Sequence, residues 1–420
     1  MAEKIPSGRQ LSSWKEIADF LGVTERTAQY WEQEKSLPIK RVAGARGRVS
    51  ADADELERWK RSVLHRVPWH SSVKFLRFST AISSAALILM GGILIGTQIA
   101  ANRVGPPARY QIDVDTVIVR DQTGREVWRK TFEDRFFAGA YTETGITDSR
   151  MIWFGRLGTR HGISTLFVYY PISRNTKGTA LICFSEKGEE LWRFTPGMPV
   201  SDREGRYSPT YAIGDFRVTS LLPGGPLRIL ITSHHTYHDP NQFAVLDENG
   251  KLLHQYWHSG YLPTLEVADI NGDGINEILL AGVNNGYRSA TLVVLDPRKI
   301  GGASTQQRGD PTQLQGFGPG TESAIFLFPR SCVSQRRQYN IVSNLSATRG
   351  LVKVDVEEVE NEGRALVIYE FNGNLEPKDV TISDFLKDVH NAMSAKGELD
   401  HPFSESESEI LKRNLRKLPQ

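Results

Sequence analysis

The residue pattern with the clearest chemistry lies between Asp269 and Glu277. Side chains that carry oxygen recur there at alternate positions, as Asp269, Asn271, Asp273 and Glu277, around a glycine that permits a sharp turn. Calcium prefers a shell of carboxylate, amide and carbonyl oxygens. The spacing therefore predicts one calcium ion held by these four side chains and by the backbone carbonyl of Ile275, with water completing the shell. A plain turn rich in Asp and Asn is the alternative.

A second pattern suits nucleic acid. Residues 35–50 contain five basic side chains and no acidic one, and they follow a predicted helix whose outward face is polar. Basic side chains can contact phosphates, while polar side chains on a helix can reach base edges in the major groove of DNA. The candidate DNA-contacting residues are Thr24, Arg26, Thr27, Gln29, Tyr30, Lys40, Arg41, Arg46 and Arg48.

Short elements must position these side chains. Ser13 and Glu16 form a capping-box pattern that predicts a helix ending at Gly22, and Thr24 can cap a second helix over residues 25–33. The chain then changes to a strand-like pattern around a small, flexible tip, which predicts a β-hairpin, and a third helix follows.

These residues resemble a known family. The stretch SWKEIADFLGVTERTAQYWEQEKSLPIKR, followed by RVSADADELERWK, is similar to the MerR-like or excisionase-like winged helix-turn-helix over about residues 11–60. The resemblance implies a DNA-binding domain over residues 1–62. It implies that Arg26, Thr27, Gln29 and Tyr30 form the recognition surface. It also implies that Arg46 and Arg48 make the contacts of the wing. A small helical domain that holds a protein partner, with its basic face toward anionic lipid, is the alternative.

Residues 78–101 carry no charged side chain and are rich in Leu, Ile and Ala. About 20 such residues in a helix cross a bilayer, so the stretch predicts one transmembrane helix; a buried core helix or part of a signal peptide is the alternative. A juxtamembrane linker over residues 63–77 precedes the stretch. More basic residues flank the stretch on its N-terminal side than on its C-terminal side, which places the N-terminus in the cytoplasm. The expected location is a bacterial inner (cytoplasmic) membrane crossed once, with the C-terminal domain periplasmic or extracellular. Gly92 and Gly96 offer a homodimer contact between two such helices, although glycine is common in membrane spans.

Charge divides unevenly along the 420 residues. Residues 1–77 carry 15 Lys and Arg against 10 Asp and Glu, a net +5, while residues 102–420 carry 36 against 39, a net −3. The basic N-terminal part suits a polyanionic partner. Cys183 and Cys332 both follow the apolar stretch, and their wide separation leaves open whether they pair.

A strand–turn–strand phrase recurs after a linker over residues 102–109. Its turn glycines are Gly124, Gly188, Gly250 and Gly373, which lie 64, 62 and 123 residues apart. The last interval is close to two periods, so the repeat is about 60 residues long.

This repeat predicts a propeller-like all-β domain of five to seven blades over residues 110–382. A β-sandwich with unrelated hairpins is the alternative. Together with the calcium loop, the repeats resemble FG-GAP or VCBS propeller repeats, although only the loop from Asp269 to Glu277 carries a full ligand set. Residues 383–420 predict a helical C-terminal tail.

Enzymatic activity is not expected. The chain lacks a Gly-x-Ser-x-Gly elbow, a phosphate-binding loop and an HExxH motif. His234, His235, His238 and Asp239 are close in sequence, but consecutive strand residues point to opposite faces, so loop or pocket roles are expected for them rather than zinc ligation.

These expectations combine into a multidomain chain: a small α+β winged helix-turn-helix, a single transmembrane helix and a large all-β propeller-like domain. The predicted function is that of a membrane-tethered, one-component transcription regulator. It would bind double-stranded DNA in the cytoplasm and an unknown ligand or protein outside. The alternative is a surface or periplasmic interaction or adhesion protein whose cytoplasmic domain binds a protein partner.

Overall fold

The computed structural model describes most of the chain. The described residues are 9–41, 49–64, 104–141, 151–159, 162–236, 238–307, 309–336, 339–359 and 364–418. The backbone divides into two compact units. The first unit consists of Met1–Thr131 and Arg135–Gly145, and the second consists of Phe132–Asp134 and Ile146–Gln420.

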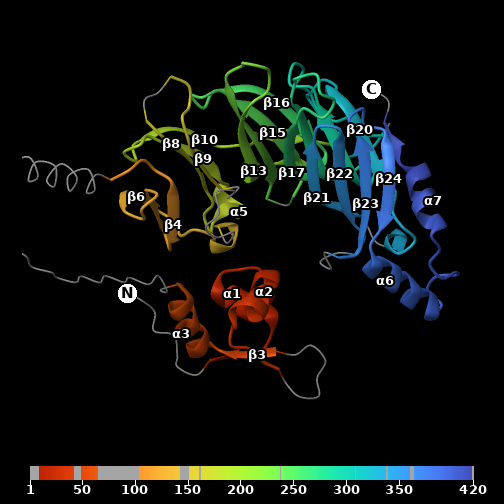
Figure 1. Ribbon diagram of the computed structural model, residues 1–420, viewed down its shortest axis with the longest axis horizontal. Helices are drawn as coiled ribbons and strands as arrows, with labels where there is room; N and C mark the ends of the chain where they lie inside the picture. The colour runs from red at the N-terminus through yellow and green to blue at the C-terminus, as the bar shows by residue number, and fades with distance from the viewer. Residues whose placement is uncertain are drawn as a thin grey trace, which may run out of the picture. The chain divides into compact units, whose positions relative to one another are not determined.

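The N-terminal module, residues 9–41 and 49–64, combines three helices with a small antiparallel sheet (Figure 1). Its elements are α1 (Trp14–Leu21), α2 (Glu25–Lys35), α3 (Ala53–Leu64), β1 (Gln10–Leu11), β2 (Lys40–Arg41) and β3 (Val49–Asp52). β3 lies between β1 and β2 and pairs with both. Ile17, Ala28 and Leu56, one from each helix, are fully buried in a common core. Each helix is therefore anchored by one apolar face.

A three-stranded antiparallel sheet completes the described part of the first unit. It is formed by β4 (Arg109–Asp113), β5 (Thr116–Arg120) and β6 (Glu126–Thr131), and the short helix η1 (Ala138–Tyr141) follows. Val117 and Val119 are fully buried, whereas both residues at the ends of β4 are exposed. The central strand β5 thus carries the apolar residues of this sheet.

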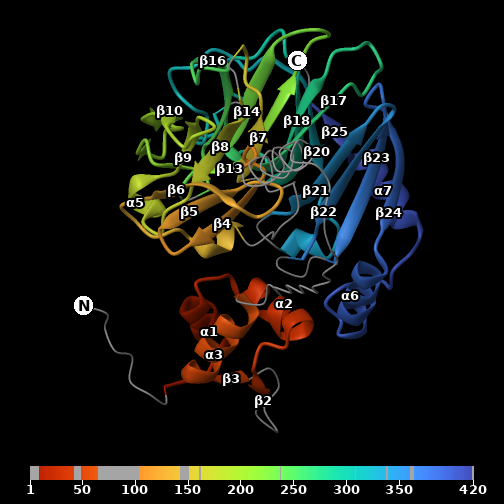
Figure 2. The same cartoon turned by 60° about the vertical axis from the view of Figure 1, so that its left-hand side comes forward.

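The second unit is a succession of antiparallel sheets in which strands follow one another in chain order (Figures 1 and 2). The first sheet holds β7 (Ile152–Gly155), β8 (Ser164–Tyr169), β9 (Ala180–Phe184) and β10 (Glu190–Phe194). The second holds β13 (Tyr211–Ser220), β14 (Leu227–His235), β15 (Asn241–Leu246) and β16 (Leu252–His258). The third holds β17 (Gly260–Ala268), β18 (Glu277–Asn284), β19 (Ser289–Leu295) and β20 (Glu322–Phe328), and the fourth holds β21 (Ile341–Thr348), β22 (Leu351–Glu357), β23 (Leu366–Asn372) and β24 (Pro377–Ile382).

Successive sheets pack face to face because their central strands are apolar on both faces. In β14, Ile231 joins a core with Leu166 of the first sheet, and its neighbour Leu230 joins a different core with Leu280 of the third. Consecutive strand residues point to opposite faces, so one sheet contributes to two cores. A third core joins the strands of the third and fourth sheets in the same way.

The recurring turns share one geometry. The residue that closes each turn has a positive φ, which glycine adopts without a steric penalty: Gly124 at 85°, Gly188 at 82° and Gly250 at 78°. Three positions before each of these, an Asp or Ser side chain accepts a backbone N–H across the turn. In the fourth copy that role belongs to Asn372, so Leu375, with φ 59°, closes the turn, not Gly373.

Two helices and a short strand close the chain. α6 (Asp384–Ala395) and α7 (Ser406–Asn414) pack on β23 and β24 (Figure 1), and β25 (Arg416–Lys417) then pairs with β20 (Figure 2). Leu386 and Leu411 bury one face of each helix in the core of the third and fourth sheets. Smaller elements are α5 (Arg174–Lys177), β11 (Val200–Ser201), β12 (Arg206–Tyr207) and η2 (Ser334–Arg336).

The expected fold class needs correction. The described residues are predominantly β, with 43% strand and 17% helix, in separate antiparallel sheets that do not close into a propeller there. A winged helix-turn-helix is not shown either: β2 has two residues, and residues 42–48, which would form the wing tip, lie outside the described residues. Cys183 and Cys332, whose pairing the sequence left open, do not form a disulfide with each other.

The expected membrane location is corrected as well. Among the residues that the structure describes, no helix is long and apolar enough to cross a bilayer. α3 and α6 have 12 residues each, whereas a span needs about 20. Residues 78–101, with Gly92 and Gly96, lie outside the described residues. The assignment as a single-pass inner-membrane protein is therefore withdrawn.

Candidate functional site

The exposed face of α2 is the first candidate site. Ser13 caps α1, where its Oγ accepts the N–H of Glu16 at 3.2 Å, and Gly22 ends that helix with φ 72°. The chain can then begin α2 directly, because Thr24 Oγ1 accepts the N–H of Thr27 at 3.2 Å. A hydroxyl cap of this kind stabilises a helix by about 1 kcal/mol. The side chains of α2 are thus held on an anchored, capped helix.

The α2 side chains divide between core and solvent. Ala28 is fully buried, and Trp31 packs on Trp59 of α3 with ring centroids 5.5 Å apart. Arg26 is exposed and the Tyr30 side chain is 56% exposed. The remaining expected contact residues are half-buried or engaged locally: Gln29 is half-buried, and the hydroxyl oxygens of Thr24 and Thr27 are 2.8 Å apart.

The basic residues of β2 have acidic partners that the charge count did not reveal. Arg41 Nη2 lies 2.8 Å from Glu32 Oε2 and 2.9 Å from Oε1, and Lys40 Nζ lies 3.3 Å from Glu55 Oε2. The two basic side chains remain 67% and 65% exposed. Such exposed ion pairs are weak, about 0–1 kcal/mol, so a phosphate can displace the carboxylate.

Two predicted wing contacts, Arg46 and Arg48, lie outside the described residues. The structure therefore brings together Arg26, Gln29 and Tyr30 on α2, and it places Lys40 and Arg41 on β2 in the same module.

The predicted calcium loop connects β17 with β18. Asp269 accepts the N–H groups of Gly272 at 2.7 Å and Gly274 at 3.0 Å, and both glycines have positive φ. Asp273 Oδ1 accepts the N–H of Ile275 at 2.8 Å, and Glu277 Oε2 accepts that of Ile270 at 3.0 Å.

The side-chain oxygens of this loop thus already bond its backbone. Burial raises the pKa of Glu277, and the Asp273 and Asp269 carboxylates nearby add to that effect. Asn271 Nδ2 bonds Glu277 Oε1 at 3.0 Å. The carboxylates share one turn, and calcium binding there stays a prediction.

The histidines of β14 occupy a different kind of environment. His234 Nδ1 lies 2.8 Å from the carbonyl oxygen of His235, while His235 Nε2 lies 3.0 Å from Ser208 Oγ. Burial lowers the pKa of His234 to about 4, so its ring is neutral at pH 7. Its ring meets that of Tyr261 edge-on at 4.9 Å. The histidines therefore pack against the fold and do not converge as ligands.

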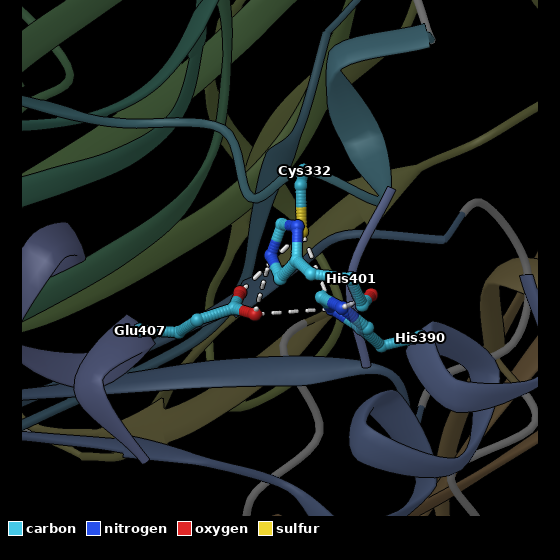
Figure 3. A group of neighbouring side chains, drawn as sticks. All are labelled: Cys332, His390, His401 and Glu407. Atoms are coloured by element: carbon cyan, nitrogen blue, oxygen red, sulfur yellow. Dashed lines mark hydrogen bonds and ion pairs between the residues drawn. The ribbon is translucent and has the colours of Figure 1, made fainter. Parts of the chain in front are cut away.

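A cluster that the sequence analysis missed joins the loop after β20 to the C-terminal helices. It consists of Cys332, which follows β20, His390 of α6, His401 of the connecting loop and Glu407 of α7 (Figure 3). One donor atom of each side chain lies within 4.8 Å of those of the other three. His390 is 2% exposed and Glu407 9% exposed, so part of the cluster is deeply buried.

Four distances define this Cys–His–Glu cluster. Cys332 Sγ lies 3.2 Å from His390 Nδ1 and 3.4 Å from Glu407 Oε2. Glu407 Oε1 lies 3.4 Å from His390 Nδ1 and 3.4 Å from His401 Nε2. Burial and the Glu407 carboxylate raise the pKa of the Cys332 thiol to about 12. A nearby signal existed in the sequence, because His390, His401 and Glu407 all fall within residues 390–407.

Comparison with known proteins assigns no family. No protein-family model matches the chain, and a search of curated proteins finds no match. A solved protein of unknown function from Bacteroides caccae is similar at 12% identity with a TM-score of 0.22; the match covers 67% of this chain and 93% of that one. So low a TM-score supports no argument. The assignments to a MerR-like or excisionase-like DNA-binding family and to FG-GAP or VCBS propeller repeats are therefore withdrawn.

Proposed function

We propose that the protein binds double-stranded DNA through the exposed face of α2. The observation that carries this proposal is the position of Arg26, Gln29 and Tyr30 on one anchored helix. Residues three and four apart lie side by side on a helix surface, so Arg26 is next to both of the others. The proposal includes no membrane tether.

The chemistry of these side chains suits base edges. Arginine can bond both acceptors of guanine in the major groove, and glutamine can bond adenine on two atoms. Lys40 and Arg41 add positive charge on β2. Their carboxylate partners, Glu55 and Glu32, would exchange for phosphates when DNA binds. Helix contacts would then select the sequence, and strand contacts would fix the position on the backbone.

A protein partner for the same face is the competing function, and the test separates the two. Binding of the full chain to a fluorescent duplex is measured by anisotropy at several salt concentrations. Arg26→Ala is compared with Lys187→Ala, which removes the same charge from an exposed turn of the second unit. We expect salt-dependent binding that Arg26→Ala weakens several-fold and Lys187→Ala leaves unchanged. No binding at micromolar protein, or equal losses in both variants, would favour the protein partner.

A further inference from the structure

We propose that Cys332, His390, His401 and Glu407 bind one Zn²⁺ ion, which joins the C-terminal helices to the loop after β20. The four side chains come from three parts of the chain and point toward one another (Figure 3). This site is distinct from the predicted calcium loop and from the face of α2.

The spacing of the donor atoms fits tetrahedral zinc. Zinc binds nitrogen and oxygen at about 2.0–2.2 Å and thiolate sulfur at about 2.3 Å, so neighbouring ligand atoms in a tetrahedron lie about 3.3–3.6 Å apart. Four separations in the cluster are 3.2, 3.4, 3.4 and 3.4 Å, of which the one between Glu407 and Cys332 involves Glu407 Oε2 and the two between Glu407 and the histidines involve Glu407 Oε1. All four donor atoms lie within 4.8 Å of one another, so an ion at the centre needs the side chains to draw together by about 1 Å.

The types of donor also favour zinc. One thiolate, two imidazoles and one carboxylate are ligands that zinc accepts together, whereas calcium and magnesium prefer oxygen alone. Thiolate and carboxylate carry two negative charges, which the 2+ ion balances. An unpaired charge is far more costly to bury than a neutral group. Because Glu407 is only 9% exposed, a positive ion that neutralises its carboxylate lowers the cost of burying it.

In each histidine, one ring nitrogen belongs to the cluster and is called the inner nitrogen, and the other is called the outer nitrogen. Both outer nitrogens already have the partners that metal-bound histidines usually have. His401 Nδ1 lies 2.5 Å from Asp400 Oδ1, and His390 Nε2 lies 3.1 Å from the carbonyl oxygen of His401. An N–H at each of these outer positions leaves the inner nitrogen with a lone pair directed at the cluster. Carboxylate or carbonyl contacts of this kind orient the ring and make the imidazole a better ligand.

The inner atoms lack enough protons to satisfy one another. With both outer nitrogens protonated, His390 Nδ1, His401 Nε2 and the Glu407 carboxylate are all acceptors, and the Cys332 thiol supplies a single proton. Glu407 Oε1 is buried without a hydrogen bond, although it lies 3.4 Å from both inner nitrogens. A buried acceptor without a donor costs about 1–3 kcal/mol. A cation at the centre removes that cost for Glu407 Oε1.

A catalytic cysteine–histidine–acid arrangement does not fit the same geometry. Such a triad needs the thiol on one imidazole nitrogen and the acid on the other. Here Cys332 Sγ and Glu407 Oε1 both face His390 Nδ1, and His390 Nε2 contacts a backbone carbonyl. All four positions of a tetrahedral ion would be filled by protein, which is typical of a structural site.

The test measures metal in the full chain. Purified protein is stripped with a chelator and titrated with zinc alone against a chromophoric competitor. Glu407→Gln keeps the side-chain shape, and Cys332→Ser removes the thiolate. His254→Gln replaces an exposed histidine of β16 and serves as the matched control. Circular dichroism establishes that each variant is folded.

We expect one zinc per chain in the unaltered protein and in His254→Gln, and a loss of affinity of tenfold or more in each ligand variant. Cobalt gives a second readout, because a thiolate ligand produces a sulfur-to-cobalt charge-transfer band. That band should be present in the unaltered protein and absent in Cys332→Ser. The proposal is overturned if zinc does not bind, if the ligand variants bind as tightly as the control, or if the cobalt band survives without Cys332.

Discussion

His390 Nδ1 lies 3.2 Å from Cys332 Sγ, although 58 positions separate the two residues. The contact joins α6 to the loop after β20, and Glu407 of α7 lies next to both. Because α6 and α7 cover the last sheet of the second unit, whatever occupies this cluster also controls how firmly the C-terminal segment is held.

Zinc should therefore stabilise the chain against unfolding. A ligand at a hundredfold excess over its dissociation constant stabilises the folded state by about 2.7 kcal/mol. Thermal denaturation with zinc and with chelator should show a higher midpoint with zinc, and Glu407→Gln should lose most of that gain. An equal gain in Glu407→Gln would contradict the assignment of the ligands.

Glu32→Gln should strengthen DNA binding. The change removes the carboxylate that Arg41 contacts through both of its oxygens, so the guanidinium no longer exchanges partners on reaching a phosphate. The slope of log K against log salt should become steeper by up to about 0.9, the contribution of one phosphate contact. Folding stability should change by less than about 1 kcal/mol. Weaker binding at unchanged stability would show that Glu32 itself takes part in recognition.

Calcium should bind the loop between β17 and β18, and Asp273→Asn should prevent it. An asparagine oxygen can still accept the N–H of Ile275, so the turn is kept while one negative charge is lost. Calorimetric titration with millimolar calcium is the measurement, since calcium sites in extracellular modules bind at about 10⁻⁴–10⁻³ M. If the heat of binding is the same in both proteins, or absent from both, the loop is a structural turn and the calcium prediction is wrong.

Asp121 should make the β4–β6 sheet sensitive to acid. Its pKa is lowered, first by the hydrogen bond from the Thr123 side chain and further by the N–H groups of Gly105 and Arg125. A lowered pKa adds stability above the unfolded value of 3.8, and that stability is lost as the pH falls below it.

Hydrogen exchange of β4–β6 between pH 5 and about pH 2 is the measurement of this effect. Protection should fall with pH in the unaltered protein, and the fall should be smaller in Asp121→Asn, which cannot be protonated. Parallel profiles for the two proteins would show that other carboxyl groups control the acid response.

Local features of the fold could be predicted from the sequence, because they depend on neighbouring residues. Ser13 and Thr24 cap the helices that the pattern predicts, and Gly124 closes a hairpin turn at the expected place. Gly373 does not take that role because the acceptor of the turn is the Asn372 side chain, so the turn closes at Leu375, two positions after the glycine, with Leu375 at positive φ.

Features that depend on tertiary contacts could not be predicted in the same way. Cys332 and Glu407 are 75 positions apart, and nothing local indicates that their side chains meet. Arg41 was counted as a free positive charge because its partner Glu32 belongs to another element. A period of about 60 residues fits any series of similar sheets, so it does not establish that the series closes into a propeller.

Selection of DNA sites from a randomised duplex pool tests the central proposal most directly. The full chain and its Gln29→Ala variant are each used to enrich bound sequences, which are then read. The account predicts an enriched motif for the unaltered protein and a motif that changes at one or two adjacent positions in Gln29→Ala, where a lost base contact costs about 1–3 kcal/mol. The same motif in both proteins, or no enrichment from the pool, would contradict recognition of DNA by the exposed face of α2.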